Sequence, residues 1–259
     1  MRVNWRSGLG ALLIGGLVVA VAARLVASAS TNPNALWDVV HGVCVPAQET
    51  TGKPGACVAV DLGGGYAVLK DLRGKTQVLV IPTARVSGIE STYVLAPASP
   101  NYWDDAWKAR SYVEGYARRR IPRDDIALTV NSIYGRSQNQ LHIHVDCVRP
   151  SIAAALRANL RRLGPNWSRF SLRLEGHRYR ALWLPGAELG SRDPFKILAD
   201  GDKAARADMG AESLALVGVT APDGAPGFVL LSHRADPTRG DDGHAEELMD
   251  HHCKVLGAP

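Results

Sequence analysis

The sequence has no low-complexity segment, no strong excess of one charge and no cysteine-rich framework. Its 259 residues carry 30 basic and 25 acidic side chains, so the formal net charge is only +5. A balance this modest, without aromatic residues interleaved among the basic runs, does not favour a nucleic-acid-binding protein. The chain is long enough for one large or two small domains with a substantial core.

Long apolar runs are also scarce, and the chain has one at its start. Gly8–Ala23 is wholly apolar, and the run counted on past Arg24 to Ala29 would form a helix about 33 Å long, enough to cross a bilayer core. Arg2 and Arg6 precede the run, so the positive-inside rule places the rest of the chain across the membrane. The small residues of Ala27–Ala29 also fit a signal-peptidase site. A single-pass anchor in the cell (inner) membrane is favoured over a cleaved signal, and either one exports the body to the extracytoplasmic, periplasmic side.

The four cysteines fit an oxidising compartment. Cys44 and Cys57 flank a loop rich in proline and glycine, and a disulfide there would close a short ring worth about 3 kcal/mol. Cys147 would then pair with Cys253, although four cysteines allow three pairings. The string Asp-His-His-Cys at 250–253 occurs in palmitoyltransferases, but those enzymes need several membrane spans and a cysteine-rich zinc framework, which this sequence lacks.

The most informative stretch is residues 139–146, in which apolar and polar side chains alternate. Alternation of this kind predicts a strand with one face in the core. The opposite face then carries Gln140, His142 and His144 together. Two simpler interpretations remain open: the histidines could line a solvated sheet face, or they could bind a metal, for which no third ligand stands at a recognisable spacing.

The motif resembles that of the histidine triad superfamily, whose signature is His-x-His-x-His on a strand. The resemblance implies that His142, the middle member, is the nucleophile on a nucleotide α-phosphate and that His144 assists it. It also implies phosphate contacts from Ser137, five residues before His142, and from Asn131 further upstream. The first triad position holds Gln140, which can donate a hydrogen bond but cannot carry a proton charge.

A wider resemblance covers about residues 31–259 and points to one branch, the CDP-diacylglycerol pyrophosphatases. The stretches that carry it are Tyr66–Leu72, Gln77–Pro82, Arg85–Ser91, Cys147–Pro150, Glu175–His177 and His252–Cys253. It implies hydrolysis of CDP-diacylglycerol to CMP and phosphatidate through a cytidylyl-histidine, at a membrane and without a metal or other cofactor. Lys70 and Asp71 fall where the superfamily has a supporting His-Asp pair, so Lys70 becomes a candidate phosphate contact.

Two other functions stay open at this point. One is a broader nucleotidyl hydrolase or transferase, which would use the same histidine chemistry on another substrate. The other is a non-catalytic exported module that binds a nucleotide or a lipid, with Gln140 marking lost activity. His177 and His233 are interpreted as ordinary surface or capping histidines.

The predicted fold class is α+β: a HIT-like antiparallel sheet with packed helices, followed by a second, degenerate α+β half. The expected division is residues 1–30 as the membrane segment, 31–165 as the catalytic half and 166–259 as the second half. The predicted strands are Gly65–Lys70, Thr76–Ile81, Ile126–Val130, Tyr179–Leu184, Leu214–Val219 and Gly227–Leu231. The predicted helices are Asn101–Arg120, a helix from Pro150 that ends at Gly164, Pro194–Met209 and His244–Val255.

Overall fold

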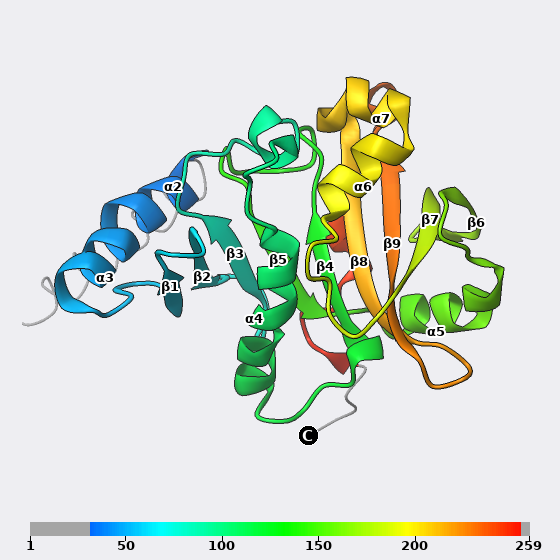
Figure 1. The fold of residues 1–259 in the computed structure, drawn as a ribbon, viewed down its shortest axis with the longest axis horizontal. Coiled ribbons are helices and arrows are strands. Elements are labelled where there is room, and N and C mark those ends of the chain that lie inside the picture. Colours follow the sequence, from blue (N-terminus) through cyan, green and yellow to red (C-terminus); the bar gives the residue numbers. More distant parts are fainter. Residues whose placement is uncertain (1–31, 255–259) are drawn as a thin grey trace, which may run out of the picture.

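The strands form one large antiparallel sheet in the computed structural model, which describes residues 32–254 (Figure 1). Within that range the sheet has nine strands in the order β1-β2-β3-β5-β4-β8-β9-β7-β6, and each adjacent pair is antiparallel. The α+β class and the antiparallel sheet are therefore confirmed. The predicted membrane helix Gly8–Ala29 lies outside the described residues. None of the helices between residues 32 and 254 is long and apolar enough to cross a bilayer.

The elements have the following bounds. The strands are β1 (Ala59–Asp61), β2 (Tyr66–Lys70), β3 (Val78–Pro82), β4 (Ile126–Val130), β5 (Ile143–Cys147), β6 (Ser168–Leu174), β7 (His177–Pro185), β8 (Glu212–Thr220) and β9 (Pro226–Arg234). The α-helices are α2 (Ala35–Val39), α3 (Val45–Thr51), α4 (Tyr102–Ala117), α5 (Pro150–Asn159), α6 (Pro194–Gly201) and α7 (Lys203–Ala207), and a π-helical stretch, η1 (Val40–Cys44), joins the first two. The short 3-10 helices are η2 (Thr92–Leu95), η3 (Arg123–Asp125), η4 (Leu160–Arg162), η5 (Met209–Ala211), η6 (Pro237–Arg239) and η7 (Ala245–Leu248).

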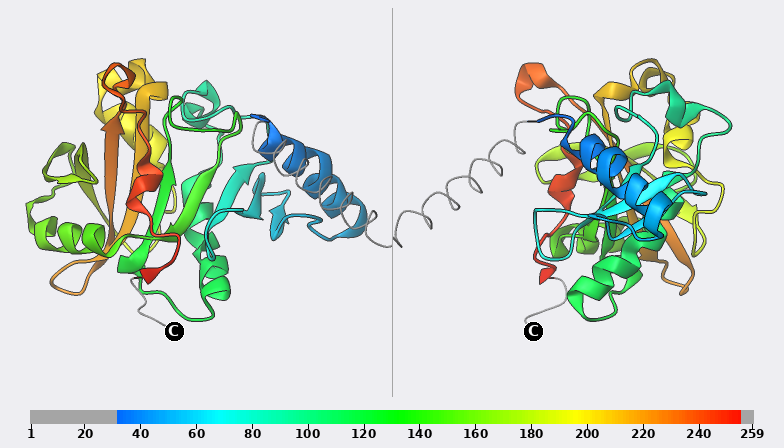
Figure 2. Two further views of the ribbon diagram at one scale, coloured as in Figure 1. Left: turned by 180° about the vertical axis from the view of Figure 1, so that it is seen from behind. Right: turned by 90° about the vertical axis from the view of Figure 1, so that its left-hand side faces the viewer.

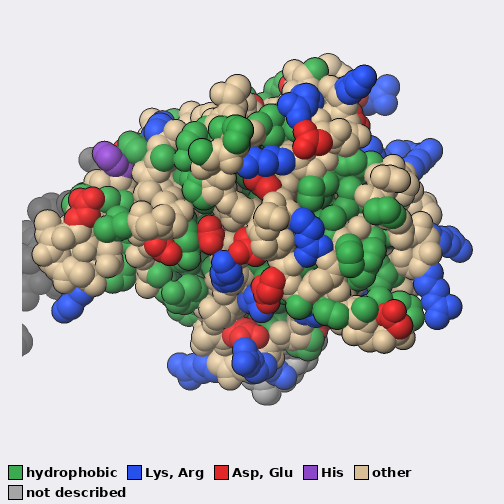
Figure 3. Space-filling model, in the orientation of Figure 1, with side chains coloured by type: hydrophobic (Ala, Val, Ile, Leu, Met, Phe, Trp, Pro, Cys, Tyr) green, Lys and Arg blue, Asp and Glu red, His purple; other side chains and the backbone are tan. Residues whose placement is uncertain are grey.

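Helix α4 covers the middle of one sheet face. Asn101 caps its first turn, and Trp103 and Trp107 are fully buried against the sheet and against the neighbouring aromatic rings of Phe195 and Phe228. Both tryptophans belong to the largest hydrophobic cluster of the described chain. Figure 3 shows this side of the molecule, where histidine colour appears only beside the N-terminal helices.

The opposite sheet face is covered by segments from both ends of the described chain. The helices α2 and α3 pack over β2 and β3, and α5 packs over the far half of the sheet. Between these two layers the C-terminal segment runs across the middle of the sheet (Figure 2, left, red). Because both faces are covered, the central strands β3, β4 and β5 are buried along their whole length.

The two predicted halves share this one sheet. Strand β8 pairs with β4 over four residue pairs. The sheet therefore continues across the expected boundary between the two halves, near residue 165. The largest hydrophobic cluster also includes residues from both sides, from Val68 on β2 to Cys253 near the end of the described chain. The halves are therefore joined by backbone hydrogen bonds and by a common core.

Two predicted helices are wrong in the structure. The predicted helix His244–Val255 is the short turn η7 followed by irregular chain, because the Asp250 carboxylate accepts from the amides of His252 and Lys254 and closes a local turn instead. The predicted helix Pro194–Met209 breaks at Asp202, whose extended backbone and capping side chain end α6 and begin α7.

Candidate active site

Two buried histidines lie at the centre of the sheet, beneath the C-terminal segment. His144 is on β5 and pairs with Leu79 of β3 and Thr129 of β4. His142 comes just before the strand, which begins at Ile143 and so starts later than the sequence pattern predicts. The side chains of both histidines are nearly inaccessible to solvent, and their ring centroids are 4.8 Å apart. The predicted pairing of the two rings on one face is therefore observed.

His142 is held in one tautomer by its own backbone. Its Nδ1 lies 2.7 Å from the carbonyl oxygen of Gln140, and because a carbonyl can only accept, Nδ1 carries the proton. The lone pair is then on Nε2, which bonds to no residue among those described. Burial, with the charge that His144 carries when protonated, lowers the pKa of His142 to about 4. At neutral pH the ring is an uncharged imidazole with one available nitrogen.

His144 is oriented from the opposite side of its ring. Its Nδ1 lies 2.8 Å from Nε2 of Gln77, and an amide nitrogen can only donate, so Nδ1 accepts and the proton is on Nε2. Burial lowers the pKa of His144 although the carboxylates of Glu246 and Asp71 oppose that shift. The Nε2–H group is buried and has no hydrogen-bond partner among the described residues. An unsatisfied buried donor is costly, and a substrate oxygen could satisfy it.

A set of polar side chains supports His144. The same amide nitrogen of Gln77 also lies within hydrogen-bond distance of Asp71 and, at 3.2 Å, of Glu246, so its two hydrogens are shared among three acceptors. Glu246 is fixed in turn by Asn131, whose side-chain oxygen accepts from the Glu246 backbone amide at 3.1 Å. Burial favours the neutral acid at Glu246, but the charge that His144 gains when its ring is protonated and the hydrogen bond from Gln77 outweigh burial and hold the pKa of Glu246 at about 2.

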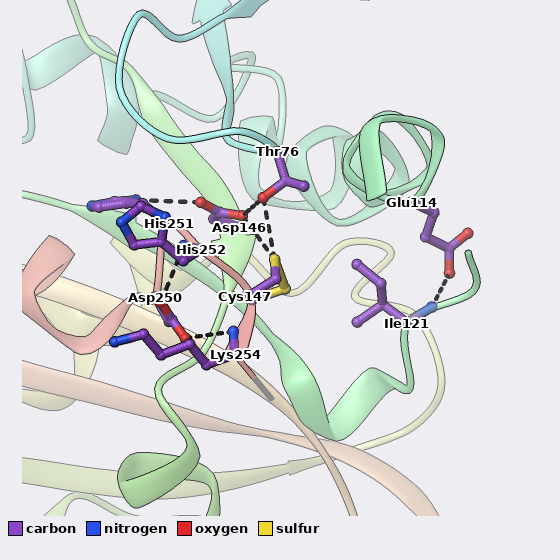
Figure 4. The surroundings of a disulfide bond; sticks show 10 residues. Thr76, Glu114, Ile121, Asp146, Cys147, Asp250, His251, His252 and Lys254 are labelled. Carbon is purple, nitrogen blue, oxygen red and sulfur yellow. Dashed lines mark hydrogen bonds and ion pairs between the residues drawn. A yellow bond between two sulfur atoms is a disulfide. The ribbon is translucent and has the colours of Figure 1, made fainter. Parts of the chain in front are cut away.

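A second layer of contacts ties the C-terminal segment to β5 (Figure 4). Asp146 accepts from the hydroxyl of Thr76 at 2.6 Å and lies 3.2 Å from Nδ1 of His251, whose pKa it raises. His251 also approaches Glu246, at 3.5 Å. Beside these residues a disulfide joins Cys147 at the end of β5 to Cys253. The segment that carries Glu246 is thus fastened to the strand that carries His144.

Both predicted disulfides are confirmed. Cys44 is bonded to Cys57 and Cys147 to Cys253, and no free cysteine remains. The first disulfide links the N-terminal helices to the segment that precedes β1. The second closes a separation of 106 residues and lies next to the site.

The structure brings some of the other predicted site residues to the histidines and separates one from them. Asn131 reaches the site through Glu246, as described above. Ser137 is exposed on the loop before His142. Its side chain makes no hydrogen bond to another residue in the described range 32–254. Lys70 lies on the opposite sheet face from His144: it pairs with Val78, which pairs with Val145, and its Nζ sits over the Tyr116 ring of α4. The sheet register therefore removes Lys70 from the histidine face.

Gln140 is wholly engaged by the backbone. Its side-chain nitrogen donates to the carbonyls of Pro82 and Ala84, and its oxygen accepts from the amide of Val86. These bonds anchor the loop before His142 to the end of β3. Gln140 therefore acts on the geometry of His142, and its side chain has no donor left for a phosphate.

Three residues of the site could not be recognised from their local sequence. Gln77 is a single polar residue beside an apolar strand, and this pattern alone does not indicate a functional residue. Glu246 lies in a segment without a recognisable motif. Arg73 lies on the turn after β2, close enough that its charge lowers the pKa values of both His144 and Glu246. Arg73 thus offers the site the positive charge that the sequence predicts from Lys70.

The oxygen and nitrogen atoms of Asp71, His144 and Glu246 lie close enough together to consider a metal ion. The amide nitrogen of Gln77 already occupies the space between them, because it lies within hydrogen-bond distance of all three. This group therefore fits a hydrogen-bonded support for His144 better than a metal site.

The described part of the chain is thus an α+β protein whose antiparallel sheet presents a neutral histidine with a free nitrogen, braced by a second histidine and buried carboxylates. Comparison with known proteins places it more narrowly: residues 31–257 match the family of CDP-diacylglycerol pyrophosphatases, and the chain belongs to that family. A CDP-diacylglycerol pyrophosphatase from Yersinia pestis is 38% identical over 254 residues, which cover 98% of this chain and 96% of the relative.

Proposed function

We propose that this protein hydrolyses CDP-diacylglycerol to CMP and phosphatidate through a cytidylyl-histidine intermediate on His142. Family membership supports the substrate and the hydrolysis. The observation that carries the mechanism is the state of His142, which is neutral, has its proton on Nδ1 and has a free Nε2. A nucleophilic histidine needs this state, because a protonated ring has no lone pair to donate.

In the first step Nε2 of His142 attacks the cytidylyl phosphorus in line with the anhydride oxygen. A nitrogen–phosphorus bond forms, and the anhydride bond breaks toward phosphatidate. The leaving group is a phosphate monoester, whose second pKa is about 6, so it departs without a strong acid. The positive charge that develops on the ring is shared with the Gln140 carbonyl through Nδ1–H.

The non-bridging oxygens gain negative charge in this step, and His144 is placed to stabilise it. Its Nε2–H is buried and unpaired, so it can donate to such an oxygen without first losing another partner. Arg73 adds a positive charge nearby. Water then attacks the phosphorus of the cytidylyl-histidine, which releases CMP and regenerates neutral His142.

We also propose that the body works at the extracytoplasmic face of the cell membrane, held there by Gly8–Ala29. Two disulfides support an oxidising compartment. Exposed apolar side chains occur on both loops that lead to the site: Leu72 follows Asp71, and Ile133 and Tyr134 follow Asn131. They offer the acyl chains of a lipid substrate an apolar approach, while residues 131–137 and the histidines hold the nucleotide end.

The histidine triad resemblance extends this proposal to the domain organisation. Residues 31–165 would be the HIT-like catalytic half, and residues 166–259 the second half. The contact of Glu246 with His144 supports a composite site, in which the second half supplies a residue that positions a histidine of the first.

The test is turnover of CDP-diacylglycerol in mixed micelles by the full chain, in water enriched in oxygen-18. We expect CMP and phosphatidate, with the label in CMP, because water attacks the cytidylyl phosphorus. Label in phosphatidate would contradict a cytidylyl-histidine. Soluble CDP-alcohols serve as the comparison: similar kcat/KM on these and on the lipid would refute the lipid preference, and no turnover of either would favour a binding module.

A further inference from the structure

A second cluster of histidines and carboxylates lies on the same sheet face as the active site, toward β7 and β9. His177 begins β7, His233 is near the end of β9, and Asp241 lies on the loop that follows η6. Oδ2 of Asp241 is 3.1 Å from Nδ1 of His177 and 2.8 Å from Nε2 of His233. Contrary to the sequence interpretation, His233 is buried and is not a surface histidine.

The hydrogen bonds of His233 place two hydrogen-bond acceptors face to face at the centre of this cluster. Its Nδ1 lies 2.9 Å from the carbonyl oxygen of Arg178 and must donate to it. In the neutral ring the lone pair of Nε2 then points at the Asp241 carboxylate, 2.8 and 2.9 Å from its two oxygens. Two acceptors at this distance repel each other, so a positive species has to lie between them.

His177 presents the same arrangement. Its Nδ1 faces Asp241, and its Nε2 lies 3.5 Å from Oε2 of Glu247. The other oxygen of Glu247, Oε1, accepts a hydrogen bond from the hydroxyl of Tyr179. Each histidine therefore turns one ring nitrogen toward the shared centre and the other toward an acceptor outside it. Metal-binding histidines show this pattern, in which an outer carboxylate or carbonyl fixes the ring and makes it a better ligand.

We propose that His177, His233 and Asp241 bind one zinc ion, with Glu247 and the Arg178 carbonyl as the outer partners of the two rings. Two imidazoles and a carboxylate suit zinc. Ligand bonds of about 2.0–2.2 Å place neighbouring ligand atoms about 3.3 Å apart, so the observed separations need only a small outward shift. Asp241 and Glu247 together carry two negative charges, which one divalent ion balances. His177 and Asp241 are partly exposed, so water can complete the coordination.

The site would fasten the C-terminal segment at a point next to the active site. Glu247 turns toward this cluster, whereas its neighbour Glu246 turns toward His144. Ser132, one residue after Asn131, donates from its backbone amide to the carbonyl of Gly243, two residues beyond Asp241. Zinc at this point would therefore reduce the freedom of the chain that positions Glu246, without touching the substrate.

The test is zinc content of the full chain, purified without a polyhistidine tag, stripped with EDTA, reloaded with zinc and washed. Elemental analysis should find about one zinc per chain. Asp241→Asn keeps the shape of the side chain but removes its charge and should weaken zinc affinity at least tenfold, as should His177→Ala. Glu247→Gln should weaken it about tenfold, because it alters an outer partner.

Two controls separate this cluster from the rest of the chain. His252→Ala removes an exposed histidine from the same C-terminal region and should leave zinc content unchanged. His144→Ala should also retain zinc, and its loss there would place the ion at the active site and overturn the proposal. Circular dichroism checks that each variant folds. No retained zinc in the wild type would mean that the cluster is an ion pair only, and equal affinity in Asp241→Asn would place the zinc elsewhere; either result overturns the proposal.

Discussion

Nδ1 of His142 donates to the carbonyl oxygen of Gln140 across 2.7 Å, and the side chain of Gln140 is in turn bonded to the backbone between Pro82 and Val86. The tautomer of the proposed nucleophile is therefore set by a loop that is itself held at the end of β3. Gln140 contributes to this anchoring through its side chain, so it supports the geometry of His142 without facing the substrate itself.

The two histidines should differ sharply on substitution. His142→Ala removes the nucleophile and should lower kcat by more than about 10⁴-fold, whereas His144→Ala removes one donor to the phosphoryl oxygens and should cost about 10²–10³-fold. Rates of CMP release measure both, and mass spectrometry of acid-quenched wild type should find a cytidylyl group on the peptide containing His142. If His144→Ala is the inactive variant and His142→Ala keeps most turnover, the assignment of the nucleophile is wrong.

Acid should destabilise the protein through its buried histidines. The pKa of His142 falls from 6.5 in the unfolded chain to about 4 in the folded protein, and that of His144 is lowered as well. Between these pH values the unfolded chain binds more protons, so stability is full above about 6.5 and is lost as the pH falls through about 4. His251, with a raised pKa, acts in the opposite sense.

The measurement is the thermal midpoint from pH 7 to pH 4 in the wild type and in His142→Asn. The variant should show a weaker dependence on pH, and kcat/KM of the wild type should fall on the acid side with a pKa near 4. An acid limb centred near 6.5, together with equal slopes in both proteins, would contradict a buried neutral His142.

Glu246 should act as a positioning residue for His144. Glu246→Gln keeps the side-chain shape but removes the charge that faces Nδ1 of His144 at 3.6 Å. We expect kcat to fall about tenfold with little change in KM, since ground-state binding does not depend on this carboxylate. Glu188→Gln, at an exposed glutamate, is the matched control. A change in KM alone would show that Glu246 contacts the substrate instead.

Loss of either disulfide should lower the stability of the fold, but only loss of Cys147–Cys253 should also lower activity. In the chain-entropy model, loss of Cys147–Cys253, with its long loop, costs about 4.7 kcal/mol, and loss of Cys44–Cys57 about 3 kcal/mol. Cys253→Ser with Cys147→Ser should also lower kcat, because that bond ties the segment of Glu246 to β5, whereas Cys44→Ser with Cys57→Ser should largely keep kcat. Urea unfolding and CMP release test both pairs, and equal kcat in the two double variants would argue against a link between the disulfide and the site.

Local sequence determined a large part of the fold. The apolar run at Ile126–Val130 is the strand β4 with the predicted bounds, and Asn101 caps the predicted helix α4. These elements follow from short-range periodicity and capping, which the sequence shows directly. By contrast, the strand β6 and the helices α2 and α3 were not predicted. Strand β6 lies at an edge of the sheet and buries little more than Phe170 and Leu174, so its pattern is weak.

For the site, the sequence by itself determined the two histidines and their common face, and it favoured the two disulfides among three possible pairings. Tertiary structure decided which residues surround them. Lys70 and Asp71 are neighbours in the chain, yet successive residues of a strand point to opposite faces, so only Asp71 reaches His144. Glu246 lies 102 residues beyond His144 and reaches it because the C-terminal segment crosses the sheet. No local pattern encodes a contact over that separation, since it depends on strand order and on the packing of the whole chain.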